Sequence, residues 1–169
     1  MPESEGLTAL EVLGVAIRSE VQAASLYARM SEQVGNRSLA DKMRFLQHEE
    51  EKHLTILERE YRRRFPDIEL QLPARSAVPS IDGVAFTGMN APELFQLAMR
   101  SEQLAADFYS REAERSLDET GRTTLRYLSR VERGHYQMLE AEYELAARFP
   151  DYYNADDFHV GQELMHIGP

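Results

Sequence analysis

The feature of this sequence that most restricts its fold is an internal repeat. Adding 82 to a residue number maps residues 10–61 onto residues 92–143 without a gap. The turn at residues 64–67 then recurs at residues 148–151, with an offset of 84. Residues identical in the two copies include Glu20 and Glu102, Tyr27 and Tyr109, Glu50 and Glu132, and His53 and His135. Duplication of one unit is the economical explanation, so we expect a fold built from two similar halves.

Each copy is predicted to form two long helices. Apolar residues at Leu10, Leu13, Ile17 and Val21 are three or four positions apart, which is the spacing of one helix face. The same spacing recurs in the second part of the copy, between residues 39 and 61. The four predicted helices lie near residues 8–34, 38–64, 91–117 and 120–148.

Local signals support these boundaries. Thr8 with Glu11 resembles a capping box, in which each side chain bonds to the other residue's backbone. Ser38 is predicted to cap the second helix, and Asn90 precedes a good start for the third. Pro66 should end the second helix.

The segment between the two copies, residues 66–90, is predicted to be an extended crossover. It contains Pro66, Pro73, Pro79, Gly83 and Gly88, which disfavour a fifth long helix. A helix of about 27 residues spans ~40 Å, whereas an extended segment of about 25 residues reaches ~80 Å. The crossover can therefore run the length of the molecule before the third helix begins.

The sequence thus predicts one all-α domain over residues 1–169, an up-down-down-up four-helix bundle followed by a short tail at residues 150–169. In this topology the first and third helices are antiparallel. A pseudo-twofold axis then brings equivalent residues of the two copies together near the middle of the bundle.

Composition excludes several classes of site. The chain has no cysteine, which excludes disulfides, thiolate zinc sites, iron–sulfur clusters and thiol catalysis. Its 19 basic and 29 acidic residues give a net charge of -10, which argues against nucleic-acid and membrane partners. Residues 1–10 lack the features of a signal peptide, so we expect a cytoplasmic location. Any metal must be held by Glu, Asp or His.

Two Glu-x-x-His pairs are the candidate metal ligands. Glu50 with His53, and Glu132 with His135, are three residues apart and project from one helix face. A single copy would more often belong to a solvated face, but two copies at matched positions favour ligands. Each pair offers one oxygen and one nitrogen to an ion.

Glu20 and Glu102 complete the candidate site. Both lie on the apolar stripe of their helices, where an unpaired carboxylate is costly to bury. Two divalent cations would neutralise the four carboxylates of Glu20, Glu50, Glu102 and Glu132. The alternative is that these residues face solvent and form surface pairs with Arg18 or Arg100.

Tyr27 and Tyr109 lie seven residues beyond Glu20 and Glu102, two turns along the same face. That is too far to reach the Glu of the same helix. Because the two helices run antiparallel, Tyr27 could donate to Glu102 and Tyr109 to Glu20, which would orient ligating carboxylates. The alternative is two core tyrosines whose hydroxyls bond elsewhere.

These residues resemble the ferritin-like di-iron carboxylate proteins, whose site takes a Glu from each of two helices and a Glu-x-x-His from each of the other two. Over residues 8–149 the chain is most similar to the rubrerythrin-type bundle. The resemblance implies two iron ions, with manganese or a mixed pair as alternatives. It implies an oxidoreductase of the ferroxidase or peroxidase type, with peroxide or O2 as oxidant.

Two departures from rubrerythrins proper affect what the resemblance implies. Rubrerythrins have a further Glu in the third helix, where this chain has Ala105. They also carry a cysteine-ligated rubredoxin domain, which a chain without cysteine cannot form, so an external electron donor is expected. An oxygenase acting on an organic substrate and a non-catalytic storage or structural bundle stay open as alternatives. A homodimer is expected rather than a cage, because residues 150–169 make at most one short helix.

The remaining polar residues are expected to have no role in the site. His48 has no repeat mate and should lie on a solvated face. His159 and His166 belong to a tail that we expect to dock rather than to bind metal. Glu58, Glu60, Glu140 and Glu142 are repeated as well. For Glu60 and Glu142 we expect solvated charges rather than the ends of an ion-entry path.

Overall fold

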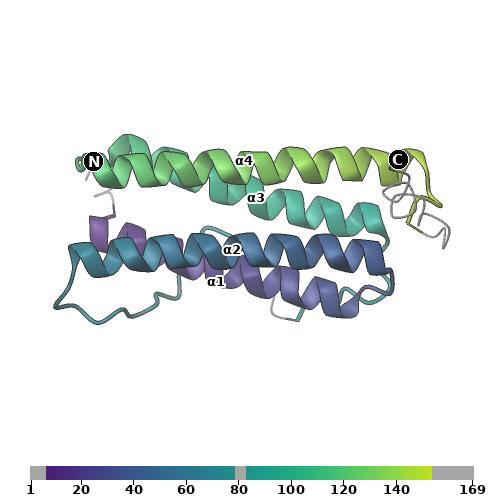
Figure 1. The fold of residues 1–169 in the computed structure, drawn as a ribbon, viewed down its shortest axis with the longest axis horizontal. Helices are drawn as coiled ribbons and strands as arrows, with labels where there is room; N and C mark the ends of the chain where they lie inside the picture. The colour runs from purple at the N-terminus through teal and green to yellow at the C-terminus, as the bar shows by residue number, and fades with distance from the viewer. Residues whose placement is uncertain (1–6, 79–82, 154–169) are drawn as a thin grey trace, which may run out of the picture.

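Four helices make up the fold, and the computed structural model describes them within residues 7–78 and 83–153 (Figure 1). They are α1 Ala9–Gln33, α2 Arg37–Arg64, α3 Ala91–Arg115 and α4 Glu119–Arg148. No strand occurs in the described residues, so the predicted all-α four-helix bundle is confirmed. Each helix begins and ends within two residues of the predicted positions.

Side-chain caps explain where the helices begin. Thr8 and Glu11 form the predicted capping box at α1, and Asn90 with Glu93 forms a second one at α3. The prediction for α2 was wrong: Asn36, rather than Ser38, accepts from the backbone N–H of Leu39, at 2.9 Å. Asn36 has the extended backbone that an N-cap requires, so the helix starts slightly earlier than expected.

The chain has the up-down-down-up topology. In Figure 1, α1 and α2 form one antiparallel hairpin, α3 and α4 form the other, and the crossover returns along the bundle so that α3 runs antiparallel to α1. Hydrogen bonds fix the crossover to α1, and two of them come from backbone N–H groups of the crossover. The backbone N–H of Ala77 donates to the Ser19 hydroxyl at 2.7 Å, and that of Phe86 donates to the Gln33 side chain at 3.0 Å.

The hydrophobic core consists of two clusters that lie on either side of the middle of the bundle. One contains Leu26, Met43 and Phe95, and the other contains Ile17, Leu57 and Leu128. Along each helix, a buried Glu lies between residues of the first cluster and residues of the second. The polar centre of the bundle is therefore enclosed by apolar packing at both ends.

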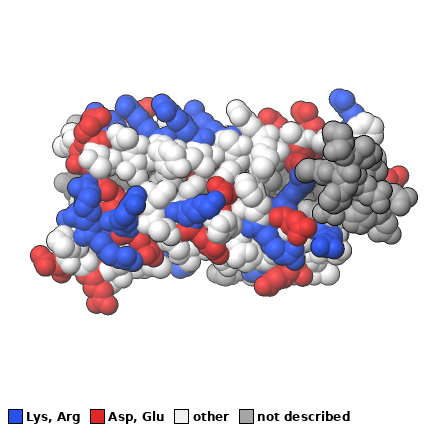
Figure 2. All heavy atoms as spheres, viewed as in Figure 1, with Lys and Arg blue, Asp and Glu red and all other residues white. Residues whose placement is uncertain are grey.

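The face of the molecule shown in Figure 2 carries acidic and basic side chains side by side. None of the four described helices is long and apolar enough to cross a membrane.

Candidate metal centre

The structure brings all six predicted ligands together in the middle of the bundle. Two groups of side chains each place their donor atoms within 4.8 Å of one another. One group consists of Glu20, Glu50, His53 and Glu132, and the other of Glu50, Glu102, Glu132 and His135. Glu50 and Glu132 belong to both groups, so the two groups share these two carboxylates.

Distances within the first group are short. His53 Nδ1 lies 3.0 Å from Glu132 Oε1 and 3.3 Å from an oxygen of each of Glu20 and Glu50. An imidazole nitrogen and carboxylate oxygens from α1, α2 and α4 therefore converge on one point.

The second group repeats this arrangement. His135 Nδ1 lies 3.1 Å from Glu132 Oε2 and 3.6 Å from an oxygen of each of Glu50 and Glu102. The rings of His53 and His135 are stacked, with centroids 5.6 Å apart. The pseudo-twofold expected from the sequence thus relates the two halves of the cluster.

Several carboxylate oxygens of the cluster lack a hydrogen-bond partner. All six side chains are buried, and within the described part of the chain Glu20 Oε2, Glu50 Oε1 and Glu132 Oε1 have no hydrogen-bond partner. A buried carboxylate oxygen without a partner is costly. Bound cations would satisfy these atoms, and a donor set of carboxylate and imidazole suits iron or manganese. The residues present therefore fit a metal site.

Electrostatics distinguishes Glu50 from Glu20 and Glu102. Burial raises the pKa of Glu20 and Glu102 well above the ordinary value, and the charges of neighbouring carboxylates raise it further. Burial also raises the pKa of Glu50, but the adjacent imidazoles of His135 and His53 outweigh it and lower that pKa to about 2. A bound cation would favour the ionised form of both groups, so metal ions and protons compete for Glu20 and Glu102.

Both imidazoles favour the protonated form when no metal is bound. Burial lowers the pKa of His135, but the carboxylates of Glu102, Glu132 and Glu50 outweigh this effect and raise it to about 12. Carboxylates raise the pKa of His53 in the same way, against the opposing effect of burial. Because a ligand must be deprotonated to bind metal, protons and metal ions compete for both residues.

The two tyrosines connect the hairpins. The Tyr27 hydroxyl donates to Glu102 Oε1, and the Tyr109 hydroxyl donates to Glu20 Oε1. Both side chains are fully buried, and burial raises the pKa of each phenol well above its ordinary value. Each tyrosine therefore stays a donor and holds the Glu of the opposite hairpin in one orientation.

The comparisons with known proteins agree with this geometry. The family model described as rubrerythrin matches residues 11–143. The chain belongs to the rubrerythrin family.

Two solved structures resemble this rubrerythrin-family chain. A hypothetical protein from Pyrococcus furiosus is 33% identical, with a TM-score of 0.75, covering 85% of this chain and 92% of that one. An uncharacterized conserved protein from Magnetospirillum magnetotacticum is 20% identical, with a TM-score of 0.69, covering 82% and 95% respectively. The second likeness concerns the fold alone. No curated protein matches the chain.

At the position where rubrerythrins proper have an additional Glu, the structure has Ala105. Ala105 and its repeat mate Ala23 are both buried. Small apolar residues thus stand on both sides of the pseudo-twofold, and neither supplies a further oxygen to the cluster.

Among the other repeated or titratable residues, one expectation is confirmed and one is wrong. His48 is exposed, as predicted. Glu60 is buried and accepts from Arg63 and Arg64, at 2.6 to 2.9 Å, so its expected solvation was wrong. Its mate Glu142 is half-buried and pairs with Lys42 at 2.5 Å. His159 and His166 lie outside the described residues.

The sequence reasoning missed one buried charge, Glu112. It lies near the end of α3 and contacts Arg111 at 3.1 Å and Arg115 at 3.3 Å. Its repeat mate is Met30, a fully buried core residue. A charged residue at the position of an apolar mate was the signal that could have identified it.

Proposed function

We propose that this protein is a di-iron redox protein that reduces peroxide or O2, acting as a ferroxidase or peroxidase with an external electron donor. Manganese, or a mixed pair of ions, is the alternative metal content. One observation carries the proposal: two groups of donor atoms share Glu50 and Glu132, and three buried carboxylate oxygens in them lack hydrogen-bond partners. Such sharing suits two ions held side by side rather than one isolated ion.

Two adjacent Fe(II) ions supply two electrons to one molecule of peroxide or O2, which neither ion supplies alone. The protein's part is to hold the ligands and to control protons. Glu50 and Glu132 hold the two halves of the centre together, while Glu20 and Glu102 each serve one half. The hydroxyls of Tyr27 and Tyr109 fix the orientation of those two carboxylates. The two apolar clusters exclude bulk water from the centre.

The two alternative functions have less support. An oxygenase requires an apolar channel that reaches the metals, but the apolar cavity of about 330 Å³ in the described structure has none of the six proposed ligands in its lining. A purely structural role for the metals would leave the redox-suited donor set without a use. The expected homodimer stays a prediction, which analytical ultracentrifugation would test.

The deciding experiment is anaerobic loading with Fe(II), followed by metal analysis and by separate stopped-flow addition of O2 and of peroxide. We expect two iron ions per chain and an optical change faster than oxidation of free Fe(II). His53→Ala should bind less iron, whereas His48→Ala is the matched control on the same helix and should bind two. A bound iron pair that neither oxidant changes would contradict the redox role and leave an inert metal clamp. Wild-type protein that binds no iron would contradict the centre itself.

A further inference from the structure

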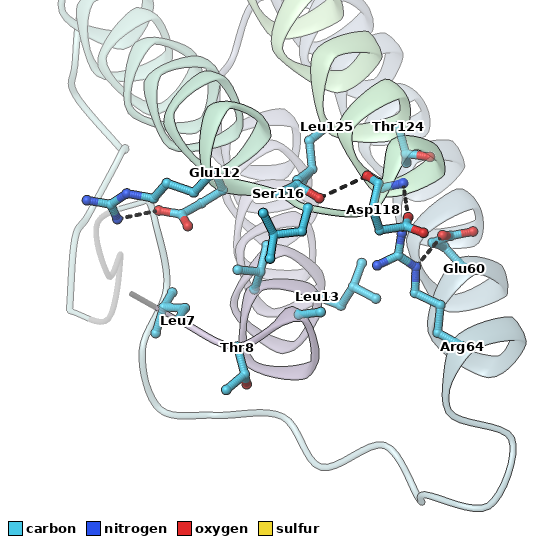
Figure 3. Close-up of a pocket in the computed structure, with 15 residues that line it drawn as sticks. Leu7, Thr8, Leu13, Glu60, Arg64, Glu112, Ser116, Asp118, Thr124 and Leu125 are labelled. Atoms are coloured by element: carbon cyan, nitrogen blue, oxygen red, sulfur yellow. Dashed lines mark hydrogen bonds and ion pairs between the residues drawn. The ribbon is translucent and has the colours of Figure 1, made fainter. Parts of the chain in front are cut away.

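The charged side chains at one end of the bundle are bonded to one another. A cavity of about 330 Å³ lies there, and Figure 3 shows Arg64 in its wall between Glu60 and Asp118. Arg64 donates to Glu60, at 2.6 Å, and to Asp118. Arg115 donates to Glu112 at 3.3 Å. These charged groups therefore already have partners within the chain.

The other end of the bundle is closed by Tyr153. Its ring packs against Phe95, with centroids 5.7 Å apart, and its hydroxyl donates to Glu142. Asn36 donates to the Tyr153 carbonyl. With the offset of 84 that holds beyond the helix end, the counterpart of Tyr153 is Glu69, which is exposed. The two ends thus use different side chains, but at both ends the polar groups bond within the chain.

The outer surface of α4, in contrast, carries a line of apolar residues that the core does not use. We call this line the α4 stripe, and it consists of Tyr127, Val131, Gly134, Met138, Ala141 and Leu145. None of the six belongs to either core cluster. Tyr127 is 51% exposed, and Met138 and Leu145 are each 37% exposed. The alternating steps of four and three positions are those of a seam between two packed helices.

The equivalent line on α2 is mostly charged. The repeat mates of Val131, Gly134, Ala141 and Leu145 are, in that order, Glu49, Lys52, Arg59 and Arg63. Lys52 donates to Glu49 at 2.5 Å. The other two mates, Phe45 and Ile56, are apolar. Since α2 forms the same bundle with charges at four of these six positions, packing within the chain does not explain the α4 stripe.

Gly134 is the member of the stripe that an isolated helix explains least. It lies in the middle of α4 and is exposed, and a Cβ atom built there would meet nothing within 4 Å. Glycine destabilises a helix interior relative to alanine, and no neighbour within the chain requires it here. A residue without a side chain lets the backbone of a second helix approach closely.

We propose that the α4 stripe is the surface through which two copies of this chain form a homodimer, with their α4 helices antiparallel across a twofold axis. The pairs across the axis are Tyr127 with Leu145, Val131 with Ala141, and Gly134 with Met138, one residue of each pair from each copy. The two members of a pair are equally far from the midpoint of the stripe, so the surface is complementary to itself. Two of the pairs combine a larger side chain with a smaller one, which suits close packing.

The charges along α4 favour the antiparallel orientation. Between residues 126 and 145 the exposed charged residues are Arg126, Arg130 and Arg133 in the first half, and Glu140 and Glu144 in the second. In Figure 2, blue side chains lie along the upper edge over the first half of α4, and red ones lie further along it. An antiparallel pair places the basic half of each helix against the acidic half of the other, whereas a parallel pair would oppose like charges. Arg130 and Glu144 lie beside the stripe, so they form two symmetric ion pairs between the copies.

This interface goes beyond the proposed redox function and does not rest on it. Its central residue, Gly134, lies between Glu132 and His135 in the sequence, but none of the six proposed metal ligands belongs to the stripe. Association of the two copies is therefore expected with and without bound metal.

The test is analytical ultracentrifugation of the full-length protein over a range of protein concentrations. As-purified and chelator-treated protein are compared, and iron content is measured separately. We expect a reversible dimer in both forms. Gly134→Arg places a long charged side chain close to the twofold axis and should weaken association by ~100-fold or more. Gln103→Arg adds the same side chain at an exposed position of α3 and should leave the dimer unchanged.

Charge reversal tests the orientation of the two helices. Arg130→Glu and Glu144→Arg each place like charges together and should weaken the dimer about 10-fold. The double variant restores both ion pairs with their signs exchanged, so it should recover most of the affinity. Circular dichroism establishes that each variant is folded, and this comparison stands even if Gly134→Arg does not fold.

Four results would overturn the proposal. They are a wild-type protein that stays monomeric, an assembly larger than a dimer, a Gly134→Arg variant that dimerises as tightly as Gln103→Arg, and a double variant as weak as the single charge reversals. Dimers formed by metal-free protein support the interface whatever the reactivity of the iron-loaded form. A dimer whose bound iron reacts with neither oxidant would contradict only the redox function.

Discussion

The middle of the bundle and its two ends use the internal repeat in different ways. In the middle, each of Glu20, Tyr27, Glu50 and His53 has an identical repeat mate, and the mates converge on one cluster. At the ends the mates differ: Met30 corresponds to Glu112, and Leu13 corresponds to Phe95. The proposed pair of similar ions would require two similar sets of donors, which explains a symmetric centre. Nothing in that chemistry requires the two ends of the bundle to match.

The largest expected effect is the loss of bound metal when a ligand of the symmetric centre is replaced. Glu50→Ala and Glu132→Ala each remove a carboxylate that belongs to both groups of donors, so each should abolish binding of both ions. Glu20→Ala removes a carboxylate from one group only and should reduce the metal content by about half. Metal analysis of the purified variants measures this, with the exposed neighbour Glu51→Ala as the control.

Two full metal equivalents in Glu50→Ala or Glu132→Ala would contradict the shared ligands. An unequal loss between these two variants would contradict the functional equivalence of the two hairpins.

The next effect concerns the ends. Tyr153→Ala removes a buried ring and its bond to Glu142, which should cost about 3 kcal/mol of unfolding free energy. A loss of that size should lower the melting temperature by ~6 to 12 °C in a chain of this length. Glu69→Ala, at the counterpart position, should change the unfolding free energy by less than ~0.5 kcal/mol because Glu69 is exposed.

Calorimetry on both variants checks the contrast between the ends. Equal losses in Tyr153→Ala and Glu69→Ala would mean that the two ends are not as different as the structure indicates.

Metal removal should lower the unfolding free energy of the protein by about as much as Tyr153→Ala does, or slightly less. Metal ions that bind only the folded state at 100 times their dissociation constant stabilise it by about 2.7 kcal/mol. Without them the buried carboxylates face one another, so chelator-treated protein should melt at a lower temperature. Re-addition of Fe(II) under anaerobic conditions should restore the original value, and equal melting temperatures with and without chelator would contradict the coupling.

Much of the middle of the molecule could be predicted from the sequence. The repeat and the length of the crossover were enough to predict an up-down-down-up bundle in which six side chains meet, and the structure has that topology and that convergence. Helical periodicity is a local signal that repeats many times along each helix. Antiparallel packing then turns that local signal into long-range contacts, such as those from Tyr27 and Tyr109 to the opposite hairpin.

The ends could not be predicted in the same way. The position of Tyr153 depends on how a short segment after α4 folds back onto Phe95, and no periodic pattern encodes that turn. Burial of Glu60 depends on whether Arg63 and Arg64 turn toward it or toward solvent, which the spacing of charges alone does not decide. The choice of Asn36 over Ser38 as a cap is likewise a competition between two good capping residues two positions apart.

The smallest effect sharpens the symmetry of the centre, and it concerns the hydroxyls of Tyr27 and Tyr109. Phe replacements remove only an oxygen atom from each fully buried side chain, so both variants should fold and bind two ions. The loss of a hydrogen bond to a charged carboxylate is worth about 1.5 to 3 kcal/mol, which corresponds to a ~10-fold or larger change in the rate of Fe(II) oxidation if the bond matters in the slow step.

Because the pseudo-twofold exchanges Tyr27 with Tyr109, the two variants should be affected alike, and stopped-flow oxidation after anaerobic loading measures both rates. Wild-type rates in both variants would assign the tyrosines to packing alone, whereas a change in only one would mean that the two halves of the centre differ in reactivity despite their equivalent geometry.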